Sequence, residues 1–162
     1  MKFYIRRENE DYLSRFFILD DLGKEKYKVK GLNVKLGEQF AIMDNNIKLA
    51  SIRKLSFPFI GIYHISHAKK EIGLMENRIC ATNPSYHIIG INWTLKNGTS
   101  PYSFSLLAGN GDIIMKQSKV WGIFGESYEL EIFIEKFEIK CLCIAICVDS
   151  LLICERKLPA LN

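Results

Sequence analysis

Motifs that carry enzymatic chemistry are missing from this chain of 162 residues. It has no G-x-S-x-G nucleophile elbow, no phosphate-binding P-loop and no H-E-x-x-H metal motif. His64 and His67 are three residues apart, which on a strand puts them on opposite faces, so they cannot chelate one ion together. The sequence therefore predicts a protein that is not an enzyme and that uses no cofactor and no metal.

A strong charge of one sign is also missing. The chain has 22 Lys and Arg against 18 Asp and Glu, a formal net charge of +4. This mild excess permits anionic partners, but nucleic-acid-binding proteins are usually more basic, so no nucleic acid is expected. Arg6, Arg7 and Glu8 stand where a signal peptide would have its apolar centre. We therefore expect a cytoplasmic protein, with peripheral contact to a membrane surface left open.

Cysteine is present without the spacing of a ligand set. Four of the five cysteines crowd into one apolar run, and no CxxC pair or neighbouring histidine completes a metal site there. Cys143, Cys147 and Cys154 would share one stripe of a helix. Free cysteine behaves as a small hydrophobe in packed interiors, so the cysteines are predicted to be core residues.

That apolar run, Cys141 to Cys154, is too short for a bilayer, which needs about 20 apolar residues. Its apolar residues do not alternate, which favours a helix, predicted here over residues 137–156. A helix that is apolar all round belongs in a core or in a membrane, and we favour the core over a membrane hairpin or tail anchor. Its expected core residues are Leu142, Ile144, Ala145, Ile146, Val148, Asp149 and Leu152.

Asp149 needs a separate prediction because a buried carboxylate is costly unless it is paired or hydrogen-bonded. We expect it to lie near a barrel mouth and to pair with a basic or backbone group. A small ligand site is the alternative.

The preceding residues repeat with a period of 23. Aromatic residues open the copies at Phe17, Phe40, Tyr63 and Tyr86, each followed by alternating apolar residues and, in the first two copies, by a turn rich in Asp, Gly or Asn. This pattern is typical of β-hairpins with one buried face. About a dozen strands are predicted in residues 1–134, which indicates an all-β barrel or sandwich, with a propeller or solenoid as the alternative. A barrel is favoured because its interior accommodates the apolar helix, and residues 1–162 are expected to form one domain.

Several stretches resemble a known family: Asp21-x-Gly23-x-x-x-Tyr27-x-Val29-x-Gly31, Ser118-Lys119-Val120-Trp121, Tyr128-x-Leu130-x-Ile132 and Leu142-x-Ile144-Ala145-Ile146-x-Val148-Asp149. They look like the LURP-one-related, YxjI-like branch of the tubby C-terminal-like superfamily. The resemblance covers nearly the whole chain and implies a mainly β fold, a closed antiparallel barrel of about twelve strands around a buried C-terminal hydrophobic helix. Asn45-Asn46 and Gln117 depart from the family pattern, which has a glycine turn and an aliphatic residue at these places.

Relatives in that superfamily include tubby domains, which bind phosphoinositide head groups through basic residues, and phospholipid scramblases. No tubby-type binding motif maps onto this chain residue by residue. Lys24, Lys26, Lys28 and Lys30 recur with period two, however, and are predicted to share one strand face, with Lys35, Arg53 and Lys54 nearby. These lysines could bind anionic phospholipid or phosphoinositide head groups at a membrane surface, or they could simply be a solvated outer face that opposes aggregation.

Two classes of function stay open on the sequence alone. One is a non-catalytic module that binds anionic lipid. The other is a protein-interaction adaptor or structural protein, with Phe57, Pro58 and Phe59 as its apolar contact to a partner.

Overall fold

The computed structural model describes residues 1–7, 16–34, 37–57, 60–67, 70–78, 85–100, 102–122 and 125–157. These residues form twelve strands, a short 3-10 helix and one α-helix. The strands are β1 (Lys2–Arg7), β2 (Phe16–Leu19), β3 (Glu25–Val34), β4 (Gly37–Asp44), β5 (Ile47–Phe57), β6 (Ile60–His67), β7 (Lys70–Arg78), β8 (Ser85–Ile89), β9 (Trp93–Asn97), β10 (Phe104–Ala108), β11 (Ile113–Gly122) and β12 (Gly125–Ile132). The helices are η1 (Glu135–Phe137) and α1 (Glu138–Lys157).

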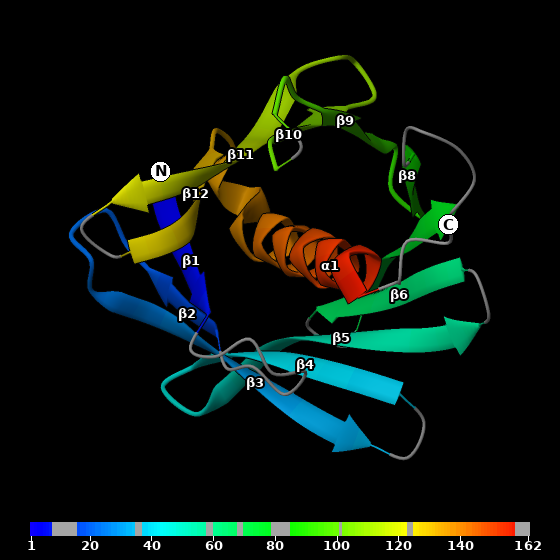
Figure 1. The fold of residues 1–162 in the computed structure, drawn as a ribbon, viewed down its shortest axis with the longest axis horizontal. Helices are drawn as coiled ribbons and strands as arrows, with labels where there is room; N and C mark the ends of the chain where they lie inside the picture. The colour runs from blue at the N-terminus through cyan, green and yellow to red at the C-terminus, as the bar shows by residue number, and fades with distance from the viewer. Residues whose placement is uncertain are drawn as a thin grey trace.

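The strands close into one antiparallel barrel. Each strand pairs with its neighbours in the chain, and β1 completes the ring by pairing with β12, with Phe3 opposite Leu130 (Figure 1). The amino terminus fixes this seam, since the Met1 ammonium donates a hydrogen bond to the Ile132 carbonyl at 2.7 Å. The ring is weakest between β8 and β9, where His87 opposite Thr94 is the only pair among the described residues. The predicted barrel of about twelve strands is confirmed.

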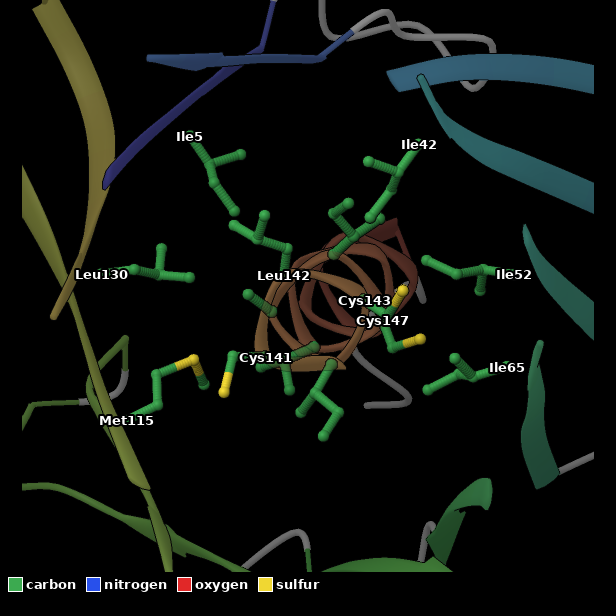
Figure 2. Packing of buried hydrophobic residues seen from close by; sticks show 14 of the residues in the cluster. Ile5, Ile42, Ile52, Ile65, Met115, Leu130, Cys141, Leu142, Cys143 and Cys147 are labelled. Carbon is green, nitrogen blue, oxygen red and sulfur yellow. The ribbon is translucent and has the colours of Figure 1, made fainter. Parts of the chain in front are cut away.

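The apolar run lies along the barrel axis as α1, where strands surround it (Figure 1). Every residue from Cys141 to Val148 is at most 1 % exposed, so this stretch is buried around its whole circumference. Figure 2 shows Ile5 and Leu130 directed at the side of the helix that carries Leu142, and Ile52 and Ile65 at the side that carries Cys143 and Cys147. The helix is therefore the centre of the core, as the sequence predicted.

β-Bulges recur with the same 23-residue period. In the hairpins β2–β3, β4–β5 and β6–β7 the second strand carries one extra residue close to the turn, and these residues are Lys26, Leu49 and Ile72, spaced 23 residues apart. A fourth bulge places Ile114 in the same position of the β10–β11 hairpin. Leu49, Ile72 and Ile114 all pack into the core or against it, whereas Lys26 is charged.

The predicted starting position of the first copy is wrong by one residue. Phe16 and Ile18 point into the barrel, at 2 % and 0 % exposed, and Phe17 lies on the outer side. The later starts, Phe40, Tyr63 and Tyr86, are all buried. The spacing of the buried starting residues therefore holds between the second and fourth copies but does not extend back to Phe17. The chain from Phe16 to its partner Val29 is one residue longer than that from Phe40 to its partner Ile52, and a shift of one residue reverses which side chains are buried.

The barrel has two ends, which are distinguished below. At the entry end α1 begins, and the turns at residues 20–24, 45–46 and 109–112 lie there together with η1. At the exit end the strands β1, β3, β5, β9 and β11 finish. The direction of α1 follows from its contacts, because Glu138 meets Lys26 at the start of β3 and Asp149 meets Arg7, the last residue of β1.

Candidate functional site

Of the four lysines predicted to share one strand face, two lie on the outer face of β3. Tyr27 and Val29 point into the barrel, so Lys28 and Lys30 lie exposed on the outer side of β3, as alternation requires. Lys24 precedes the strand, in the turn. Lys26 is the bulge residue, and the extra residue turns it towards the entry end of the helix. The prediction that all four lysines share one face is therefore wrong for Lys26.

Lys26 belongs to a cluster that closes the entry end. Its Nζ lies 3.0 Å from Glu138 Oε1 and 4.9 Å from the ring centroid of Phe3. The Tyr27 hydroxyl donates a hydrogen bond of 2.6 Å to the same carboxylate oxygen. Burial and this hydrogen bond raise the pKa of Tyr27 well above its ordinary value. The charge of Lys26 is thus neutralised by the protein itself, so its position indicates a structural role.

Lys28 is also partly neutralised. Its Nζ lies 3.2 Å from Glu25 Oε1, an approach that the bulge permits by placing both side chains on the outer face. The turns of the entry end carry further acidic residues, namely Asp20, Asp21, Asp44 and Asp112. At this end, then, basic side chains lie among carboxylates.

The exit-side half of the barrel has a different charge distribution. Four exposed basic residues point outward beyond the midpoints of their strands, and none of them forms an ion pair within the described part of the chain. They are Arg6 on β1, Lys30 on β3, Arg53 on β5 and Lys96 on β9, called here the exit-side basic residues. The exit-end carboxylates with described side chains, Glu126 and Asp149, are paired with Lys119 and Arg7. Among the described residues, the outer surface of this half therefore carries basic side chains without a neighbouring carboxylate partner.

The remaining predicted contacts are placed differently. Lys54 is half-buried and lies opposite Tyr63 on an inward-facing row of β5, so it is not part of the outer surface with Arg53. Phe57 ends β5. Lys35, Pro58 and Phe59 lie outside the described residues. The suggested partner contact at residues 57–59 stays a prediction.

Asp149 is a buried structural acid. It is 4 % exposed and forms an ion pair with the Arg7 guanidinium, which also lies 4.8 Å from the ring centroid of Phe16. This agrees with the expected pairing near a barrel mouth. A partner already held by the fold explains the acid without a ligand.

The cysteines with described side chains are protonated core residues. Cys141, Cys143 and Cys147 are free thiols with no measurable exposure. Burial raises the pKa of Cys141 to about 12 and raises those of Cys143 and Cys147 further. A thiol in this state is a poor nucleophile and a poor metal ligand. Among the described residues no group of three His, Cys, Asp or Glu side chains is placed to hold a metal ion.

Two features were not predicted from the sequence. Gln117 is 3 % exposed on the inner face of β11, and both polar atoms of its amide lack a hydrogen-bond partner among the described residues. Trp121, near the end of the same strand, is 77 % exposed. The family pattern had marked Gln117 as unusual. For Trp121 there was no such signal in the sequence, and its position outside the core is seen only in the folded structure.

The described helices include none with the length and apolar character required to cross a membrane. For α1 the burial by the barrel gives the positive reason for its apolar sequence. The side chains from Cys141 to Val148 pack in the core against the inner faces of the strands.

Comparisons with known proteins agree with this architecture. A family model described as LURP-one-related matches residues 1–149. The chain is 28 % identical over 153 residues to a Bacillus subtilis protein described as uncharacterized protein YxjI, with 94 % of each chain covered. It is also similar to an Arabidopsis thaliana protein of known X-ray structure, with a TM-score of 0.56, 13 % identity, and 91 % and 90 % of the two chains covered. None of these descriptions names an enzymatic activity or a ligand.

Proposed function

As the chain belongs to the LURP-one-related family, its function has to be argued from its own surface, and we propose that it is a non-catalytic module that binds anionic membrane surfaces through its exit-side half. The observation that carries the proposal is the difference in described carboxylates between the two halves of the barrel, since exposed basic residues such as Lys24 and Lys48 occur at the entry end as well. Acidic residues occupy the entry-end turns, while the outward-facing exit-side basic residues have no carboxylate partner within the described part of the chain. Anionic lipid head groups would supply the missing negative charge.

Ion pairs within the protein make some basic residues better candidates for this role than others. Lys26 and Lys28 already interact with Glu138 and Glu25, so a lipid phosphate would have to compete with a carboxylate of the same molecule. Lys30 and Arg53 have no such competitor among the described residues, and both are exposed. Each basic residue near an anionic leaflet contributes about 1 kcal/mol. The proposal therefore rests on Lys30 and Arg53 together with Arg6 and Lys96.

Vesicle sedimentation tests the proposal with a matched pair of double variants. Neutralising Lys30→Gln with Arg53→Gln should weaken binding to phosphatidylserine-containing vesicles roughly thirtyfold, as two contacts of about 1 kcal/mol each would give. The control is Lys28→Gln with Lys48→Gln, which makes the same charge change on the same two strands in the entry-side half. It should leave binding nearly unchanged. Binding should also disappear at about 1 M salt, where the Debye length is about 3 Å.

The outcomes separate the alternatives. Equal weakening by both double variants would show that only net charge matters and would contradict the exit-side assignment. A wild-type protein that ignores anionic vesicles would reject the membrane proposal. The second candidate, a protein-interaction adaptor, is favoured by the exposed apolar side chains of the entry end, Leu22 at 86 % and Ile47 at 67 %. Contacts of that kind would persist in high salt.

A further inference from the structure

One large apolar side chain departs from the pattern of the molecule. Six of the exposed large hydrophobic residues with described positions lie towards the entry end or its turns: Met1, Leu22, Ile47, Ile89, Ile113 and Phe133. The seventh, Trp121, lies at the exit end and is 77 % exposed. Burying an aromatic ring is strongly favourable, so a tryptophan that the fold leaves this exposed is available for contact with a partner.

The backbone of Trp121 is held by strand pairing, while its side chain lies outside the core. It is the second-to-last residue of β11 and lies opposite Glu126, and the ladder continues to Gly122 opposite Gly125. Two residues earlier, Lys119 forms an ion pair with Glu126 and lies 4.9 Å from the ring centroid of Tyr102. These contacts fix the backbone of the β11–β12 hairpin, which lies at the left of Figure 1. The indole thus lies near the end of a paired ladder, opposite the residue that forms the ion pair with Lys119.

Tryptophan combines an apolar ring with one N–H donor, and it is enriched where membranes meet water. Trp121 lies at the exit end of the barrel half that also carries the exit-side basic residues. An anionic bilayer satisfies both features, with phosphates for the basic side chains and an interfacial layer for the indole. Electrostatic attraction alone would leave the orientation of the barrel loosely defined, whereas an inserted ring fixes which end faces the lipid.

We infer that Trp121 is an interfacial anchor that inserts into the head-group region of an anionic bilayer and sets the barrel with its exit end towards the membrane. This inference rests on the proposed function and adds to it a residue, a depth and an orientation. The basic residues attract the protein to the anionic surface, and Trp121 inserts into the head-group region.

The chain offers a built-in pair of fluorescent probes, because it has two tryptophans. Trp93 is 9 % exposed at the entry end and packs edge-to-face on Phe137 with ring centroids 4.9 Å apart. The difference between the emission of the wild type and that of Trp121→Phe therefore reports Trp121 without disturbing Trp93. The variant Trp93→Phe provides the same information directly if it folds.

On adding phosphatidylserine-containing vesicles, Trp121 emission should shift to the blue and should be quenched by lipids brominated near the head group. Trp93 emission should not change. Trp121→Ser, at a site too exposed to affect folding strongly, should bind these vesicles roughly tenfold more weakly, a loss of about 1.4 kcal/mol. Sedimentation is measured on the same samples.

Two results would overturn the inference. If the protein sediments with the vesicles while Trp121 emission stays unshifted and unquenched, insertion is wrong and the electrostatic proposal survives. If the protein does not sediment with anionic vesicles at all, both the proposed function and the anchor are wrong.

Discussion

Two carboxylates of the central helix are met by basic residues of the barrel in different surroundings. Glu138 is the first residue of α1, at the entry end, and Asp149 lies in the second half of the helix, towards the exit end. At the entry end the side chains of Lys26 and Glu138 are 41 % and 13 % exposed, and at the exit end those of Arg7 and Asp149 are 21 % and 6 % exposed. Both ion pairs join residues more than a hundred positions apart, yet only the second is largely removed from water.

Because of this difference in burial, loss of the two ion pairs should lower the free energy of unfolding by different amounts. A partly exposed ion pair is screened by water and typically contributes at most about 1 kcal/mol. Removing one partner of a buried pair costs more, about 3 to 5 kcal/mol, because the remaining charge is left in a medium of low polarity. The entry end should therefore tolerate changes that the exit end does not.

The largest expected effect concerns the stretch between the two ends. The folded-state pKa of Cys141, Cys143 and Cys147 lies above the ordinary thiol value of 9.0, so above that pH the unfolded chain loses protons that the folded protein keeps. The contribution of the thiols to the free energy of unfolding should be fully present below pH 8 and should be lost as the pH rises through 9. At pH 10 the three thiols together should lower the free energy of unfolding by about 4 kcal/mol. Urea denaturation under reducing conditions measures this loss.

Single substitutions test whether the buried thiols contribute equally to the alkaline loss of stability. Cys141→Ala, nearer the entry end, and Cys147→Ala, nearer the exit end, should each remove about one third of the alkaline loss. Tyr27, whose pKa is also raised, adds to the loss only above pH 10. An alkaline loss that is unchanged in the variant lacking all three thiols would refute burial of the thiols as its cause.

The second effect should appear at the exit end. Arg7→Ala leaves Asp149 in a site where its carboxylate is 6 % exposed, and the free energy of unfolding should fall by about 3 kcal/mol. Thermal and urea denaturation at neutral pH measure the change.

A double variant separates the ion pair from its setting. Arg7→Met together with Asp149→Leu removes both charges and should recover most of the stability lost in Arg7→Ala, since an apolar pair of similar volume commonly replaces a buried ion pair at little cost. A double variant as unstable as Arg7→Ala would mean that packing of the arginine on Phe16, 4.8 Å from the ring centroid, dominates.

Much of the barrel could be predicted from the sequence because its signals are local. The alternation of Tyr27 with Val29, and the unbroken apolar run from Cys141, each follow from which side chains must be buried. The assignment of partners could not be made in this way. Lys26 looks like a member of the lysine row in the sequence, but one bulge redirects it to Glu138, and no local pattern shows a contact across 112 residues of chain.

The surface was predicted least well for the same reason. The period of two grouped Lys28 with Lys30, although a carboxylate lies beside the first and not, among the described residues, beside the second. Trp121 belonged to a family motif, and nothing in its neighbours indicated exposure. Whether a charge or a ring is available to a partner depends on tertiary neighbours, which local patterns do not encode.

The smallest effect is expected at the entry end, where Glu138→Gln removes the negative charge but keeps a side-chain oxygen as the acceptor for the Tyr27 hydroxyl. The free energy of unfolding should fall by less than about 1 kcal/mol, because Lys26 is 41 % exposed and can be solvated by water. The measurement is the same urea denaturation that is applied to Arg7→Ala, so the two ends are compared directly.

The repeat itself supplies the control for this end. Leu49 and Ile72 occupy the bulge position in the next two hairpins, so Lys26→Leu combined with Glu138→Gln gives the first hairpin the apolar residue that its neighbours already have. That pair of changes should be neutral or slightly stabilising, since an apolar side chain at this position packs against the ring of Phe3 without a charge to neutralise. A loss as large as that of Arg7→Ala would show that the Lys26–Glu138 contact holds the start of the helix as firmly as Arg7 holds its exit side, and the contrast between the two ends would fail.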